Sequence, residues 1–290
     1  MRARRVGIRF ALADRSALVR GDCSGLDVVP QDAFMDQAVK ILLEARRTMQ
    51  PGLPIGDLIG EPRLENAYRI QRRIVEALAV AGDPTVGRKI GVTAAAARQA
   101  MGIEEPLWGS LTRNSRLDSG SVIPRDRFFL PRVEVEVAFE LGEGIETIAP
   151  AATALPEAIH RAHAAIEVVD SRLAMAERDP AVMVADNVGL GYFVIGDGRR
   201  AEGIDFAGLQ MELSADGQRV ATGKGADCHG SPLHSLAWLV ERMRALGTPL
   251  QPGDWVMSGS LAPMVPARPG QNFRGNITGL GTVEVGFAHD

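Results

Sequence analysis

Residues 133–141 have the sequence VEVEVAFEL, in which apolar and charged side chains alternate. Successive side chains of a strand point to opposite faces, so this run predicts a strand with Glu134 and Glu136 on one face. Val133, Val135 and Val137 then point to the other face. The run indicates that the surrounding part of the chain is built largely from β-structure.

Other strand-like runs lie on both sides of this one. TVGRKIGVT at 85–93 predicts a strand, AAAARQAM at 94–101 a short helix, and residues 107–139 are rich in glycine, proline and short alternating runs. Further strands are predicted at 191–196, 208–223, 254–260 and 281–287. Helices are predicted at 231–246 and at 155–169, the latter running into IEVVD, which has strand character itself.

The N-terminal part has a different, helical pattern. Residues 32–50 and 64–82 carry apolar side chains at helical spacing, and a proline- and glycine-rich stretch separates the two runs. We predict three regions: a tail over 1–31, disordered or mis-started, a helical N-terminal cap region over 32–85, and a β-rich catalytic domain over 86–290. Because strands and helices do not alternate regularly, the fold class is α+β.

Composition excludes several functional classes. Lysine and arginine total 32 against 36 aspartate and glutamate, a net charge of -4, so no nucleic-acid surface is expected. No run approaches the roughly 18 apolar residues of a membrane helix. Two cysteines, Cys23 and Cys228, are too few for a disulfide framework and favour a reducing compartment. The expected location is therefore the cytoplasm, with no membrane partner.

Glu134 and Glu136 have two interpretations. Two carboxylates on one strand face repel each other unless a cation lies between them, and oxygen ligands suit Mg²⁺ or Mn²⁺. The plain alternative is a solvated strand face. Glu167 lies in the apolar stretch AAIEVVDSR with Asp170 and Arg172. Buried charges need partners, so we predict that Asp170 and Arg172 pair with each other and leave Glu167 as a further ligand; the alternative is a structural ion-pair cluster.

Lys89 lies in GRKIG between two glycines, which let a ligand approach the backbone closely. It is either an exposed lysine or a group that donates a proton or binds a carboxylate. None of the five histidines lies between Lys89 and Glu136, and no third zinc-type ligand joins His160 and His163. The sequence has no nucleophile elbow of the G-x-S-x-G type either.

Taken together, these motifs resemble those of the 2-oxopent-4-enoate (2-hydroxypentadienoate) hydratases, in the hydratase/decarboxylase branch of the fumarylacetoacetate hydrolase superfamily. The matching pieces occur in family order from about residue 54 to 287. They are LENAYRIQ, VGRKIGVT, MGIEEPLWGSL, PRVEVEVAFEL, AIEVVDSR, VADN, GKGADCHGSPLHSLAWLVERM, LGTPLQPGDWVMSGSLAPMVPARPG and GLGTVEVGF.

The resemblance implies a fumarylacetoacetase C-terminal-like β-roll of mixed sheets with a smaller helical N-terminal region. It also implies a Mg²⁺ or Mn²⁺ ion held by three carboxylates, and a homo-oligomer, associated or not with a neighbouring pathway enzyme. The site residues carried over are the ligands Glu134, Glu136 and Glu167, the catalytic candidates Lys89 and Asp118, and, for substrate binding, Lys89, Leu107, Trp108, Ser258 and Ser260.

The implied activity is hydration of 2-hydroxypenta-2,4-dienoate or a close homologue to a 4-hydroxy-2-oxo acid, in meta-cleavage degradation of aromatic compounds. Two departures stand out: Val188 and Gly189 follow VADN where the family often has a small residue and serine, and GSPLH brings Ser231 and His234. Both concern recognition of the substrate tail or the fine chemistry, and they leave the metal ligands in place. The alternatives are a 4-oxalocrotonate-type decarboxylase, a carbon–carbon bond hydrolase of the wider superfamily, and a non-catalytic partner subunit.

Overall fold

The structure, a computed structural model, describes residues 31–173 and 179–289. The tail predicted over 1–31 and Cys23 lie outside these residues, except that Gln31 begins the first helix. The helices are α1 (Gln31–Thr48), α2 (Gly56–Ile59), α3 (Arg63–Val80), α4 (Ala95–Met101), α5 (Pro180–Ala185) and α6 (Pro232–Ala245). The strands are β1 (Thr85–Gly91), β2 (Leu107–Thr112), β3 (Arg116–Asp118), β4 (Ser121–Ile123), β5 (Arg132–Leu141), β6 (Ile159–Val169), β7 (Leu190–Arg199), β8 (Gln210–Ala215), β9 (Gln218–Lys224), β10 (Trp255–Ser260), β11 (Val265–Pro266), β12 (Asn272–Ile277) and β13 (Gly281–Phe287).

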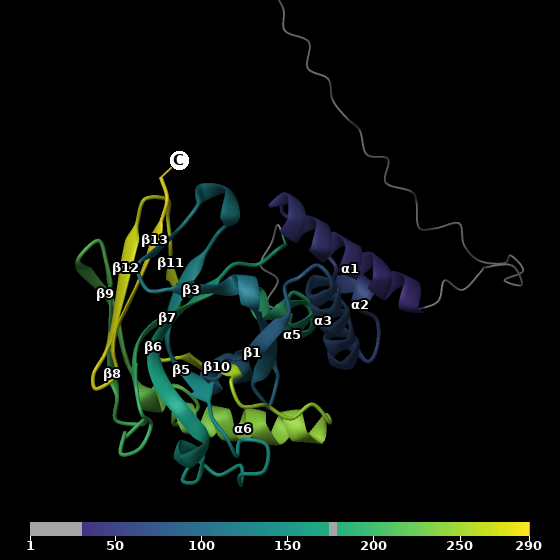
Figure 1. The fold of residues 1–290 in the computed structure, drawn as a ribbon. Coiled ribbons are helices and arrows are strands. Elements are labelled where there is room, and N and C mark those ends of the chain that lie inside the picture. Colours follow the sequence, from purple (N-terminus) through teal and green to yellow (C-terminus); the bar gives the residue numbers. More distant parts are fainter. Residues whose placement is uncertain (1–30, 174–178, 290) are drawn as a thin grey trace, which may run out of the picture. The chain divides into compact units, whose positions relative to one another are not determined.

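The strands form two mixed sheets (Figure 1). The larger sheet has the order β2-β1-β10-β5-β6-β7-β3, with β11 paired to β5, and the smaller has the order β4-β13-β12-β8-β9. In the larger sheet β1 runs parallel to β10, while β5 pairs antiparallel with both β10 and β6. The predicted α+β class is confirmed, because the helices do not alternate with a parallel sheet.

Strand β5 divides its side chains between two environments, as its alternating sequence predicts. Val133, Val135 and Val137 are buried in the main hydrophobic core, which they share with β12, β13 and one face of α6. Glu134 and Glu136 point to the opposite face. The strand therefore carries the packing of the two sheets on one side and a group of acidic side chains on the other.

The helical region packs around a second core. Apolar side chains of α1, α2 and α3 meet those of α5, which comes from the middle of the chain, so the helical core is not formed by the N-terminal residues alone. Figure 1 shows α5 beside α3. The division into a cap over 32–85 and a catalytic domain over 86–290 stays a prediction. No helix among the described residues is long and apolar enough to cross a membrane.

The helix predicted over residues 155–169 is wrong. A short 3₁₀ turn at Leu155–Ala158 is followed by the long strand β6, Ile159–Val169. The alanine-rich sequence favours a helix locally, but β6 lies between β5 and β7 with both faces covered. Small residues such as Ala162 and Ala164 fit that central position, so packing overrides local propensity.

Candidate metal centre

Three carboxylates meet on the face of the larger sheet that points away from the main core. Glu134 and Glu136 come from β5, and Glu167 comes from β6 directly opposite Glu134 in the antiparallel register. Each of the three offers an oxygen that lies within 4.8 Å of an oxygen of the other two. Strand alternation brings the first two together, and strand pairing adds the third.

Burial makes this arrangement costly without a partner cation. Glu136 and Glu167 are 0% exposed, and Glu134 is half-buried. Desolvation first, and then the charge of Glu167, raise the pKa of Glu134 to about 8. The same causes raise the pKa of Glu136 well above its usual value, and burial also raises that of Glu167. The site therefore disfavours three carboxylate charges by themselves.

Lys89 on β1 is the cation of this cluster. Its ammonium forms an ion pair with Glu167 and donates a hydrogen bond to the carbonyl oxygen of Val188 at 2.9 Å. The side chain is 2% exposed. Burial alone would lower the pKa of Lys89, but the charges of Glu167, Glu134 and Glu136 outweigh it and raise that pKa. The lysine is thus held as an ammonium beside the carboxylates.

The oxygens left over fit a divalent cation. Among residues 31–173 and 179–289, no hydrogen-bond donor reaches Oε1 of Glu136 or, apart from the Lys89 ion pair, either oxygen of Glu167. Three ionised carboxylates and one ammonium leave a charge of about -2, which a divalent cation would balance. An all-oxygen ligand set is the kind that Mg²⁺ and Mn²⁺ accept.

A bulge in β10 orients Glu136. Gly259 donates its backbone N–H to Oε2 of Glu136 at 2.9 Å, and its φ of +100° lies where only glycine is comfortable. A Cβ there would also lie 2.4 Å from the side chain of Thr93. The hydroxyl of Ser258 accepts from Val137 and donates to the Gly259 carbonyl. Ser258 thus contacts the bulge backbone.

A left-handed turn holds the carbonyl that binds Lys89. Asn187 and Val188 have φ values of +54° and +52°, and the Asn187 side chain makes two hydrogen bonds to the backbone of Ser110. Gly109 leaves room for this turn, because a Cβ there would lie 2.8 Å from the Asn187 carbonyl oxygen. Asparagine tolerates this conformation better than most residues. The turn therefore fixes Val188 against β2.

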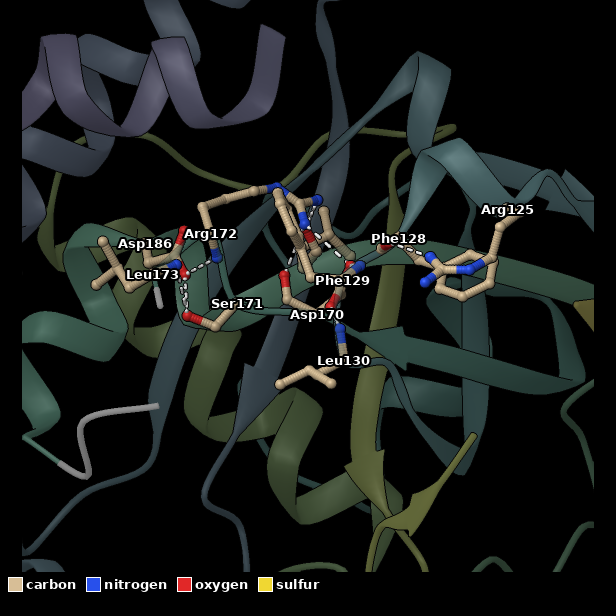
Figure 2. A network of polar contacts seen from close by, with 10 residues as sticks. Arg125, Phe128, Phe129, Leu130, Asp170, Ser171, Arg172, Leu173 and Asp186 are labelled. Atoms are coloured by element: carbon tan, nitrogen blue, oxygen red, sulfur yellow. Dashed lines mark hydrogen bonds and ion pairs between the residues drawn. The ribbon is translucent and has the colours of Figure 1, made fainter. Parts of the chain in front are cut away.

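A second group of buried charges follows β6 (Figure 2). The Asp170 carboxylate accepts hydrogen bonds from the backbone N–H groups of Phe129 and Leu130, at 2.8 and 2.9 Å. Arg172 lies 3.4 Å from this carboxylate and donates through its backbone N–H to Asp186. The predicted Asp170–Arg172 pairing is confirmed. We name these three, Asp170, Arg172 and Asp186, the arginine network.

The other predicted site residues lie in different places. On β2, Gly109 pairs with Lys89 of β1, and Leu107, two residues earlier, lies on the same face of the sheet and is buried in the helical core. Trp108 points to the other face because side chains alternate, and its ring stacks on Tyr68. Ser260 pairs with Glu136 in the β10–β5 register, and its hydroxyl donates to the Ala262 carbonyl.

Asp118 lies on β3, two strands from Glu167, with its side chain 88% exposed and 3.8 Å from Arg116. It is not among the carboxylates that meet at the cluster. Its role as an acid–base group stays a prediction. The contacts of Asn187 and Val188 are not predicted from the sequence, and the only local signal is that asparagine tolerates left-handed backbone.

The family model for the fumarylacetoacetate (FAA) hydrolase C-terminal region matches residues 89–288. The chain belongs to this family. The TodF product hydratase of Pseudomonas putida is 38% identical over 253 residues, which cover 87% of this chain and 94% of the relative. A 2-keto-4-pentenoate hydratase of Paraburkholderia xenovorans is 34% identical over the same shares of both chains. The resemblance inferred from the motifs is therefore confirmed.

Among solved structures, 4-oxalocrotonate decarboxylase from Pseudomonas putida, complexed with magnesium and adipate, superposes with a TM-score of 0.83. It is 26% identical, and the match covers 89% of this chain and 98% of that one. The predicted roll with a smaller helical region is thus confirmed as the fold.

Proposed function

We propose that this protein is a divalent-metal hydratase that adds water to a 2-hydroxy-2,4-dienoate and forms a 4-hydroxy-2-oxo acid. The observation that carries the proposal is the cluster of Glu134, Glu136 and Glu167, in which Oε1 of Glu136 and Oε2 of Glu167 lack the partners that buried carboxylates need. The two relatives above, both hydratases by name and both matched over most of their length, support the reaction type.

The proposed ligands are Glu134, Glu136 and Glu167, and the proposed ion is Mg²⁺ or Mn²⁺. Bound there, the ion would act as a Lewis acid on the keto oxygen and stabilise the negative charge that develops on it. Gly259 and Lys89 hold Glu136 and Glu167 in place through the contacts described above. These contacts keep two of the three carboxylates aimed at a common point.

Lys89 is the proposed proton-transfer and carboxylate-binding group. An ammonium has three N–H donors, of which one serves Val188 and one Glu167, so a third is available to the substrate. In the reaction the enol proton leaves oxygen while the terminal alkene carbon gains a proton. Water oxygen then bonds to the fourth carbon, and the third carbon gains a proton. The exposed Asp118 is not part of this proposal.

The test is an assay with purified protein and Mg²⁺ or Mn²⁺. We expect 2-hydroxypenta-2,4-dienoate to lose its ultraviolet absorbance, a 4-hydroxy-2-oxo acid to appear by mass spectrometry, and no CO₂ to be released. Glu134→Gln should abolish the activity, and full activity in this variant would remove the metal assignment. Glu212→Gln, an exposed glutamate of β8, is the matched control.

One observation favours a second candidate. The similar decarboxylase shares the fold at a TM-score of 0.83, and loss of CO₂ from a 2-oxo-3-enedioate needs the same kind of chelated 2-oxo acid. Stoichiometric CO₂ from such a diacid would replace the hydratase by this candidate. Cytoplasmic location, a homo-oligomeric state and association with a pathway enzyme stay predictions.

A further inference from the structure

A cleft of about 1390 Å³ opens beside the carboxylate cluster. Arg132 and Val169 line it, and they pair with each other across β5 and β6. Each is two residues from a glutamate of the cluster, Glu134 or Glu167, and therefore on the same sheet face at roughly 7 Å. Val188, whose carbonyl accepts from Lys89, also lines the cleft. The cleft is therefore adjacent to the cluster along β5 and β6.

The size of the cleft exceeds the need of the shortest substrate. Pockets of about 300–1,000 Å³ already enclose drug-sized ligands. A five-carbon acid whose carboxylate and keto oxygen stay at the cluster would fill only a small part of the 1390 Å³. Most of this volume is therefore available to atoms beyond the reacting carbons.

The lining offers apolar surface for such atoms. Methionine side chains are flexible and adapt to ligands of irregular shape. At the mouth, Leu130 is 82% exposed and Met264 is 42% exposed, although large apolar side chains usually avoid water. Apolar residues of the lining include Met101, Phe129, Leu130, Val182, Met183 and Met264.

Most charged groups of the lining already have partners within the protein. Both oxygens of Asp170 accept backbone hydrogen bonds, and Asp186 accepts from Ser171 and Arg172, as Figure 2 shows. Arg47 pairs with Glu44, and Arg127 lies 3.9 Å from Asp126. These walls do not need a charged ligand to balance them. Arg132 lies where the cleft approaches the cluster, two residues from Glu134 on β5.

On the basis of the hydratase function proposed above, we propose that this cleft binds the substrate tail. It selects 2-hydroxy-2,4-dienoates that carry an uncharged apolar substituent longer than methyl on the terminal alkene carbon. The acid end stays at the carboxylate cluster and the tail lies along Val169 toward Met264. A tail ending in a carboxylate would lose its hydration, and the arginines of the walls would have to give up the contacts with Glu44, Asp126 and the Phe128 carbonyl to replace it.

The first experiment measures binding without turnover. Calorimetry on the Mg²⁺-saturated protein compares saturated 2-oxo acids from 2-oxopentanoate to 2-oxooctanoate, which have no double bond to hydrate. We expect the affinity to rise about threefold per added methylene. The diacid 2-oxooctanedioate should bind at least about tenfold more weakly than 2-oxooctanoate. A flat series, or a preference for the diacid, would overturn the proposal.

The second experiment locates the tail. We expect Met264→Glu to lower the ratio of kcat/KM for a butyl-substituted dienoate to that for the unsubstituted one by about tenfold. Met264→Leu should restore the ratio. The control is Val220→Glu, on β9 outside the lining, where the residue is 44% exposed against 42% for Met264. An equal loss for both substrates in Met264→Glu would place the tail elsewhere and refute the assignment.

The two proposals fail in different ways. If no dienoate is turned over while the affinity for 2-oxo acids still grows with chain length, the hydratase proposal is lost and the cleft assignment stands. If dienoates are hydrated while affinity and kcat/KM are independent of the tail, the cleft assignment is lost and the hydratase proposal stands.

Discussion

The carboxylate cluster and the arginine network are neighbours, since Glu167 of the first and Asp170 of the second are three residues apart along the chain. They differ in how many of their charged groups have hydrogen-bond or ion-pair partners within the protein. In the arginine network each oxygen of Asp170 accepts a backbone hydrogen bond, and Arg172 supplies the opposite charge. In the carboxylate cluster Oε1 of Glu136 accepts no hydrogen bond from any described residue, and Lys89 balances one of three acidic groups.

The difference separates a structural role from a ligand-binding one. In the arginine network both oxygens of Asp170 have donors, although Nε of Arg172 has no hydrogen-bond partner among the described residues. Removing one partner of such a buried ion pair is costly. A buried carboxylate without partners destabilises the fold until a ligand supplies them. The arginine network should therefore respond to mutation through stability, and the cluster through metal binding and activity.

The largest effect is expected from Glu136→Gln, which keeps the shape of the side chain and removes a charge. Loss of one ligand should lower kcat/KM by about 10³-fold, because several kcal/mol of Lewis-acid stabilisation depend on the ion. Without metal, the same variant should melt at a higher temperature than the wild type, since it relieves buried repulsion. A lower melting temperature in the metal-free state would contradict this view of the cluster.

The opposite behaviour is expected of Asp170→Asn. The amide cannot accept at both positions, so a backbone N–H of Phe129 or Leu130 and the charge of Arg172 lose their partner. We expect the free energy of unfolding to fall by about 3 kcal/mol, measured by urea denaturation of the metal-saturated protein. The m value, the dependence of this free energy on urea concentration, should stay unchanged. Asp126→Asn, with an 80% exposed side chain, is the control and should stay within about 0.5 kcal/mol.

Metal addition gives a smaller effect that sharpens the comparison. At about a hundred times its dissociation constant, Mg²⁺ should stabilise the wild type by about 2.7 kcal/mol, and chelation should remove that gain together with the activity. The shift should persist in Asp170→Asn and be much reduced in Glu136→Gln. Equal shifts in both variants would mean that the ion binds somewhere other than the cluster.

The sequence predicted one part of this site well and another part poorly, for a physical reason. Glu134 and Glu136 were assigned to one strand face because alternation is a local property of the backbone. The sequence does not decide the role of Glu167 and wrongly predicts a helix over residues 155–169, because the partner of β6 and its register depend on contacts far along the chain. The family resemblance, not the spacing, connected Glu167 to the other two.

The arginine network and the left-handed turn show the same limit. The proximity of Asp170 and Arg172 along the chain suggested their pairing, whereas the backbone N–H groups of residues 129 and 130 lie some 40 residues away. Val188 was noted only as a departure from the family pattern. Nothing local indicates that its carbonyl would accept from Lys89, which lies 99 residues earlier.

The smallest effect tests whether that turn positions Lys89. Both Asn187→Ala and Asn187→Gly remove the two hydrogen bonds to Ser110. Alanine adopts a φ of +54° less readily than asparagine, whereas glycine adopts this left-handed conformation without strain. We expect both variants to lose about tenfold in kcat with little change in KM, because the Val188 carbonyl no longer fixes the ammonium. Only the alanine variant should also lose about 1 kcal/mol of stability from backbone strain. If both keep full kcat, the turn is a structural element and Lys89 is positioned by Glu167 alone.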